Sequence, residues 1–192
     1  MPIYISAHGP KTLEFSGRHA DGVIYGDGVG KEVVADALSA VGRGASSAHR
    51  NVKDVDIWWG LCGNVADSRQ EALSQIKMLL AAKANHLARF PEQNKHVPAE
   101  FRDVLDRIHK GYSYLEHQKP GERTTNARLV SESGLEGYLA RRYAVAGTPE
   151  ECLARLAELE NMGVQKIWLN VHFDDKIGFM KRWSRDVMAK VK

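Results

Sequence analysis

Residues 1–14 read MPIYISAHGPKTLE. Residues 3–7 are rich in β-branched and aromatic side chains, which predicts a buried strand. Gly9 and Pro10 break that pattern, and a helix is expected from about Lys11 to Ala20. A strand that runs directly into a helix through a glycine-containing turn is the repeating unit of an α/β fold.

The turn between this strand and this helix is a candidate anion site. The first backbone N–H groups of a helix have no partner within the helix, and the helix dipole favours a negative charge there. Glycine allows a ligand to approach the backbone, and Thr12 adds a hydroxyl. We therefore predict that His8, Gly9, Pro10 and Thr12 hold a phosphate group. A strand–helix turn without any ligand is the alternative that so short a pattern leaves open.

A second glycine-rich loop follows a short strand expected over residues 23–25. Neighbouring parallel strands end at the same edge of a sheet, so the two loops should open on the same side. Gly26 and Gly28 of this loop are therefore added to the candidate phosphate site.

The rest of the chain continues the alternation of strands and helices. Helices are expected over residues 31–41, 69–90 and 175–191, a polar connection over 42–54, and further strands over 55–65 and 166–173. Residues 91–140 predict a helical insertion with a loop. Thr148, Pro149 and Glu151 form a capping box that starts another helix. This order predicts an α/β fold with a parallel sheet of four strands, in one domain spanning residues 1–192.

Composition excludes several classes of protein. Of 192 residues, 43% are hydrophobic and 27% are charged, which is ordinary for a globular domain. The net charge of +3 is spread along the chain without a basic block, so a nucleic-acid partner is not expected. The apolar runs are too short to span a bilayer, and no membrane partner is expected. Cys62 and Cys152 are far apart, which favours a reduced, cytoplasmic protein.

Histidine and tyrosine side chains elsewhere in the chain are further candidates for ligand contacts. None of the eight histidines shows the HxH or HExxH spacing of a metal site, so no metal is expected. His172 ends the last predicted strand and is a candidate contact to a small-molecule substrate, with a structural histidine as the alternative. Tyr114 lies in the predicted insertion helix and is a second candidate, with helix packing as its alternative.

Three stretches carry a family resemblance. PIYISAHGPKTLEFSGRHADGVI resembles the core signature of the bacterial-luciferase-like superfamily of flavin- and F420-dependent oxidoreductases. AVAGTPEECLARLAELENMGVQKIWLNV resembles the closing helix–strand unit of that superfamily. YSYLEHQ, followed by LARRYAVAGTPEE, is similar to the branch that holds methylenetetrahydromethanopterin reductase.

The resemblance implies a (β/α)8 TIM barrel, of which this chain carries about the last four βα units as a half barrel. The first strand here resembles the fifth barrel strand, whose turn holds the cofactor phosphate in the family. That position corresponds to His8, Gly9 and Thr12, where His8 contributes at least its backbone N–H. Coenzyme F420 is the implied cofactor and FMN the alternative, for hydride transfer or monooxygenation. The family carries its acid–base residues on strands one to four, which have no counterpart here, so the catalytic residues are unknown.

Three hypotheses follow for the chain. It is part of an enzyme whose first four strands come from a partner polypeptide, or it pairs with itself as a homo-oligomeric half barrel that binds flavin without catalysis. A four-stranded parallel sheet has unpaired edges, which favour such association. The third hypothesis is a remnant that binds no ligand.

Overall fold

The computed structural model describes residues 1–90, 95–117 and 119–191. Its strands are β1 (Tyr4–Ala7), β2 (Gly22–Tyr25), β3 (Asp56–Val65), β4 (Ala144–Gly147) and β5 (Ile167–Asn170). Its α-helices are α1 (Pro10–His19), α2 (Lys31–Ser47), α3 (Arg69–Ala88), α4 (Arg102–Gly111), α5 (Thr125–Ser133), α6 (Glu136–Tyr143), α7 (Pro149–Asn161) and α8 (Lys176–Asp186). The predicted alternation of strands and helices is therefore present.

All strand pairs among the described residues are parallel, and β3 is the centre of the sheet. The first half of β3 pairs with β2, and its second half pairs with β4. Trp59 pairs with both β2 and β5, and Cys62 pairs with both β4 and β5. β2 and β4 therefore share one edge of β3, and β5 occupies the other edge.

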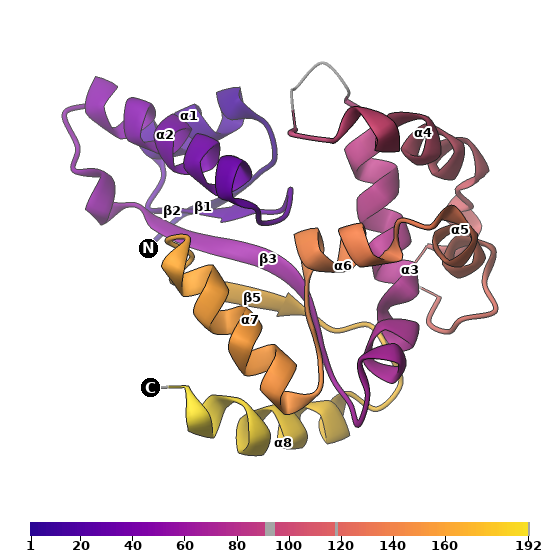
Figure 1. The fold of residues 1–192 in the computed structure, drawn as a ribbon. Helices are drawn as coiled ribbons and strands as arrows, with labels where there is room; N and C mark the ends of the chain where they lie inside the picture. The colour runs from indigo at the N-terminus through magenta and orange to yellow at the C-terminus, as the bar shows by residue number, and fades with distance from the viewer. Residues whose placement is uncertain (91–94, 118, 192) are drawn as a thin grey trace.

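One face of the sheet is buried under helices. Ala7, Val23, Tyr25 and Trp59 are nearly inaccessible to solvent, and the rings of Tyr25 and Trp59 meet edge to face at 5.1 Å. Figure 1 shows α1 and α2 together on one side of β1 and β2, α3 to α6 grouped beside the far end of β3, and α7 and α8 near β5. The core thus lies between the sheet and α1, α2 and α3.

The opposite face, which we call the open sheet face, carries Tyr4, Ile24, Trp58 and Trp168. Tyr4 is 41% exposed and Trp168 is 54% exposed. These residues line a hollow of about 440 Å³ together with Ile167 and Leu169, whose side chains belong to the other face of the sheet. Trp58 and Trp59 point to opposite faces, as expected of neighbours in a strand.

Helix α2 runs to Ser47, so the prediction of a polar connection from residue 42 was wrong. The reason is tertiary. A Cβ at Gly44 would lie 1.9 Å from the carbonyl oxygen of Glu14, and a Cβ at Gly17 would lie 2.1 Å from that of Val41. These glycines let α1 and α2 pack backbone to backbone, and this contact outweighs the poor helix propensity of glycine.

Three other boundaries differ from the sequence expectation. β5 ends at Asn170 and not at residue 173, so His172 lies beyond the end of the strand. β4 is a strand that the sequence analysis did not separate from the following capping box, which is present with Thr148 and Glu151 in the expected roles. The final α-helix ends at Asp186 and not near residue 191.

The region predicted as a helical insertion begins at residues 91–94, which lie outside the described part of the chain. Beyond it, α4, α5 and α6 pack against α3. Tyr114 lies in a 3-10 turn at Tyr114–Glu116, after the end of α4, so its placement within an insertion helix was wrong. In the part of the chain that the structure describes, no helix is both long and apolar enough to cross a membrane.

Candidate functional site

The loops after β1 and β2 meet at the carboxyl edge of the sheet. His8 Nδ1 lies 3.0 Å from Asp27 Oδ1. A Cβ at Gly26 would come within 2.4 Å of His8 Cε1, so only glycine leaves room for the His8 ring in this position. The two loops that the sequence analysis singled out are therefore in direct contact.

Gly28 has a φ of +87°, a left-handed conformation that favours glycine. A Cβ there would lie 2.6 Å from the backbone oxygen of Arg142. The neighbouring Val29 N–H donates a 2.7 Å hydrogen bond to that same oxygen. The loop after β2 is thus held closely against the end of α6.

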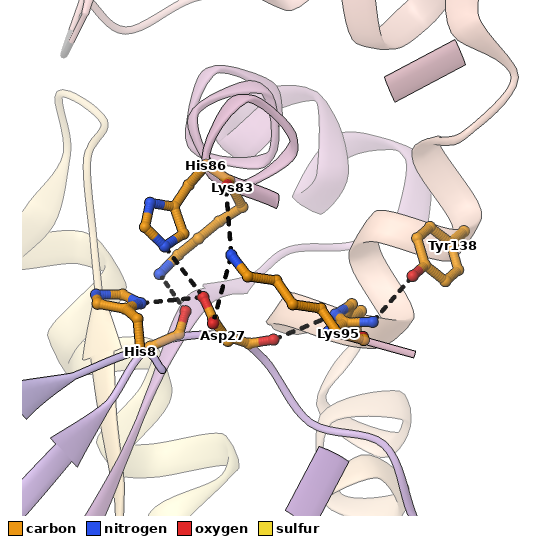
Figure 2. Close-up of polar contacts among 8 residues, drawn as sticks. His8, Asp27, Lys83, His86, Lys95 and Tyr138 are labelled. Carbon is orange, nitrogen blue, oxygen red and sulfur yellow. Dashed lines mark hydrogen bonds and ion pairs between the residues drawn. The ribbon is translucent and has the colours of Figure 1, made fainter. Parts of the chain in front are cut away.

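Asp27 is the centre of a charged cluster and is only 1% exposed. His86 Nε2 lies 3.2 Å from Asp27 Oδ1, and Lys95 Nζ lies 3.6 Å from Oδ2. Burial by itself raises the pKa of Asp27, but the contacts with His8, His86 and Lys95 outweigh it and hold the pKa well below its usual range. Figure 2 shows the two imidazoles and the lysine converging on this carboxylate, which is therefore ionised in the folded protein.

Further cations tie this cluster to the helices. Lys83 Nζ donates a 3.1 Å hydrogen bond to the carbonyl of Gly26. The Arg142 guanidinium donates to the carbonyls of Asp27 at 3.2 Å and Lys95 at 2.6 Å, and to the Tyr138 hydroxyl at 3.0 Å. One carboxylate thus shares its surroundings with two lysines and an arginine, an electrostatic environment that suits an anionic ligand.

In the described part of the chain, five helices directly follow strands, and two of them begin without a side-chain cap. The N-cap residues of α1 and α2 are Gly9 and Gly30, and neither position shows a side-chain cap among the described residues. The helices after the other three strands are capped by Ser68, Thr148 and Asp175. The open helix termini are therefore the two beside the His8–Asp27 contact.

A small cavity of about 120 Å³ lies between these two helix termini. Its walls include His8, Pro10, Asp27, Lys95 and Arg142. Gly9 and Thr12 lie at the start of α1 beside it, and Thr12 is exposed. All six residues predicted to bind the cofactor, His8, Gly9, Pro10, Thr12, Gly26 and Gly28, thus fall in or next to the two meeting loops.

The two candidate substrate residues lie elsewhere. The Tyr114 hydroxyl lies 3.3 Å from Asn85 Nδ2 on α3, whereas Asp27 contacts the next residue of that helix, His86. Consecutive residues of a helix point about 100° apart, so Tyr114 and Asp27 approach α3 from different sides. His172 follows β5 and is half-buried. Three strand spacings, about 14 Å, separate β5 from β1 along the sheet. The structure does not group either residue with His8.

The sequence analysis missed Asp27, Lys83, His86, Lys95 and Arg142. The last four lie on segments far from residues 8–28 in the chain, and no local motif marks them. A partial signal existed for Asp27, because it lies between the two glycines that were selected. Once assembled, His8, Asp27 and His86 place three possible metal-ligating atoms within 4.8 Å of one another.

Comparison with known proteins places this geometry in a family. The family model described as luciferase-like monooxygenase matches residues 1–166. The chain belongs to this family. Its α/β arrangement of helices on a parallel sheet agrees with the predicted fold class.

Relatives within the luciferase-like monooxygenase family include F420-dependent enzymes. The chain is 28% identical over 169 residues to a 5,10-methylenetetrahydromethanopterin reductase of Methanolobus tindarius, covering 87% of this chain and 47% of the relative. It is 24% identical to an F420-dependent glucose-6-phosphate dehydrogenase of Amycolatopsis mediterranei, covering 100% of this chain and 49% of the relative. The chain therefore spans about half the length of these curated relatives.

Solved structures agree with this assignment at the level of the fold. The coenzyme F420-dependent tetrahydromethanopterin reductase of Methanopyrus kandleri matches with a TM-score of 0.67 at 19% identity. That match covers 100% of this chain and 51% of the reductase chain. An α/β arrangement common to luciferase-like proteins is thus shared across the whole of this chain.

Proposed function

We propose that this chain supplies the cofactor-phosphate grip of a luciferase-like oxidoreductase that uses coenzyme F420. The observation that carries the proposal is the pair of adjacent helix termini, α1 and α2, that begin at Gly9 and Gly30 without side-chain caps. Free backbone N–H groups and two helix dipoles at one place favour a phosphate. Lys83, Lys95 and Arg142 add positive charge next to them.

Each residue has a distinct part in this proposal. Gly9 and the first turn of α1 present backbone N–H groups to the phosphate, and Thr12 contributes its exposed hydroxyl. Gly26 makes room for the His8 ring, and Gly28 sets the direction of the loop after β2. Pro10 at the first helical position fixes the start of α1. F420 would supply the hydride chemistry, and these residues would bind and orient it.

The proposed arrangement of the whole protein is a (β/α)8 barrel to which this chain gives about four βα units. The open sheet face supports this proposal, since Tyr4, Trp58 and Trp168 are apolar surface of the kind that packs in a barrel interior. In this proposal the protein is cytoplasmic, and a partner polypeptide that resembles the first half of the family fold covers the open sheet face. A second copy of the chain is the alternative, and light scattering coupled to size exclusion separates a dimer from a monomer.

Two further contacts complete the proposal. A cavity of about 480 Å³ at the ends of β3 and β5 is lined by Asn64, Phe173 and Asp174, next to His172 in the chain. We propose that a small-molecule substrate approaches from this side, with His172 as a contact. Tyr114, which is 61% exposed, is the second proposed contact.

Binding of F420 is the decisive experiment. Titration of the chain with F420 and with FMN, followed by cofactor fluorescence, should show saturable binding of F420. Thr12→Val should weaken F420 binding about tenfold, which is the low end for a hydrogen bond to a charged group, because Thr12 is exposed. The same variant should leave binding of the deazaflavin chromophore without its phosphate unchanged.

Thr125→Val on α5 is the matched control and should bind F420 as the wild type does. Tighter binding of FMN than of F420 would replace the proposed cofactor with the alternative one. Failure of the chain to bind either cofactor would refute the phosphate grip.

A further inference from the structure

His8, Asp27 and His86 come from three separate segments and present their ligating atoms within 4.8 Å of one another. His8 follows β1, Asp27 follows β2, and His86 projects from α3. We propose that these three side chains bind one divalent transition-metal ion. The site shares His8 and Asp27 with the surroundings of the proposed phosphate grip, but its evidence and its test require no cofactor. It departs from the sequence-based expectation of no metal, because the cluster exists only in the folded chain.

The distances within the cluster fit such an ion. His8 Nδ1 and His86 Nε2 lie 3.0 and 3.2 Å from Asp27 Oδ1. Zinc binds imidazole nitrogen and carboxylate oxygen at about 2.0–2.2 Å, which places neighbouring ligand atoms of a tetrahedral site about 3.3–3.6 Å apart, a few tenths of an ångström wider than the distances found here. An ion can therefore enter between the three side chains with small changes in their torsion angles.

Burial provides a second, separate observation. Asp27 is 1% exposed, and its Oδ2 atom makes no hydrogen bond in the described structure. His86 Nε2 is also buried, and although it lies close to Asp27 it is not aligned for a hydrogen bond. Buried polar atoms of this kind are rare because each one loses its hydration without a full replacement. A metal bond would satisfy the His86 nitrogen.

Nearby positive charges restrict how the ion binds. Lys95 Nζ lies 3.6 Å from Asp27 Oδ2, so the ion must bind on the Oδ1 side, where both imidazoles lie. Lys95 then interacts with Oδ2, the carboxylate oxygen that does not bind the ion, and it orients the Asp27 carboxylate as an outer-shell partner does. Lys83 and Arg142 donate to backbone carbonyls of Gly26 and Asp27, so hydrogen bonds engage both groups.

The ligand set selects the kind of ion. Two imidazoles with one carboxylate favour zinc, cobalt, nickel or iron over magnesium and calcium, which prefer oxygen ligands. The His8 side chain is 38% exposed and that of His86 is 29% exposed, so water can occupy the remaining coordination positions. The bound ion would join the loops after β1 and β2 to α3 and stabilise the fold by ligand linkage.

The test uses the untagged chain after dialysis against a chelator, without F420. Co²⁺ is titrated and followed by its visible absorption, and Zn²⁺ is titrated in a calorimeter. One equivalent should bind saturably and raise the melting temperature. His8→Gln and His86→Gln should each weaken binding by at least about tenfold, because loss of an outer-shell partner alone costs about 10–100-fold and a direct ligand contributes more.

His19→Gln is the matched control, because His19 is an exposed histidine in the last turn of α1 and should not affect binding. Absence of saturable binding by the wild type, or full affinity in His86→Gln, would overturn the proposal. If a glutamine variant does not fold, imidazole NMR signals of the wild type decide: Zn²⁺ should shift those of His8 and His86 first, and shifts confined to other histidines refute the site. None of these measurements depends on cofactor binding, so the metal titration and the F420 titration can fail or succeed separately.

Discussion

Replacing Gly28 with alanine tests the closest backbone contact in the candidate site. Gly28 has a φ of +87°, and an added Cβ would lie 2.6 Å from the Arg142 oxygen and 2.8 Å from Tyr143 Cε1. A left-handed conformation costs a non-glycine residue about 1–2 kcal/mol. Overpacking of this kind adds about 1–3 kcal/mol. We therefore expect Gly28→Ala to lower the free energy of unfolding by about 2–5 kcal/mol.

Two other glycines separate the cost of the left-handed conformation from the cost of overpacking. Gly134 also has a positive φ, of +73°, but a Cβ there meets no atom within 4 Å among the described residues. Gly134→Ala should therefore cost only about 1–2 kcal/mol. Gly137 lies within α6, and a Cβ there likewise meets nothing in the described structure, so Gly137→Ala should stabilise the chain by about 0.5–1 kcal/mol.

Urea denaturation followed by circular dichroism measures all three variants. With a slope of about 2 kcal/mol per molar urea, Gly28→Ala should move the midpoint down by about 1–2.5 M, and Gly134→Ala by about 0.5–1 M. A loss in Gly28→Ala no larger than in Gly134→Ala would show that the loop after β2 does not press against Arg142. The proposed course of this loop beside the cofactor would then be wrong.

Three further outcomes can be measured on the same chain. Gly44→Ala should destabilise it by about 1–3 kcal/mol in urea, because the new Cβ would lie 1.9 Å from the Glu14 oxygen; a gain in stability would contradict the close packing of α1 on α2. Burial acts to raise the pKa of Asp56, but the hydrogen bonds that Lys166 and other donors make to its carboxylate hold the pKa below the usual value. The ionised Asp56 therefore stabilises the folded chain above about pH 4, and this stabilisation is lost as the pH falls. The difference in urea midpoint between wild type and Asp56→Asn should thus narrow from pH 7 to pH 3, and a constant difference would argue against the ion pair. Burial raises the pKa of the Cys62 thiol to about 11, so a disulfide reagent at pH 8 should modify it only after unfolding; rapid labelling of the folded chain would contradict its burial.

The elements of the fold were largely readable from local patterns. The strand over residues 3–7 and the capping box at Thr148 depend on side chains within a few positions of one another, and both are present. The helix boundary near residue 42 was misjudged for the opposite reason. Gly44 weakens a helix when read alone, and only its contact with Glu14 in α1 explains why α2 continues.

The candidate site divides in the same way. His8, Gly9 and Gly26 could be chosen from sequence because glycine-containing strand–helix turns have a local signature. His172 was chosen because it ends a predicted strand, and Tyr114 because it lies in the predicted insertion helix; the structure keeps both apart from His8. A residue at the end of a strand is easy to identify, but its neighbours across the sheet depend on strand order.

The sequence by itself determined the alternation of strands and helices and the open turn after the first strand, because both depend on side-chain periodicity and on glycine within a short stretch. The tertiary structure alone decided what surrounds that turn. Asp27 meets His86 and Lys95 only because α3 and the segment at residue 95 fold back over the loop after β2. Electrostatic contacts act through space, so the charges that define this site come from segments whose own sequences carry no sign of it.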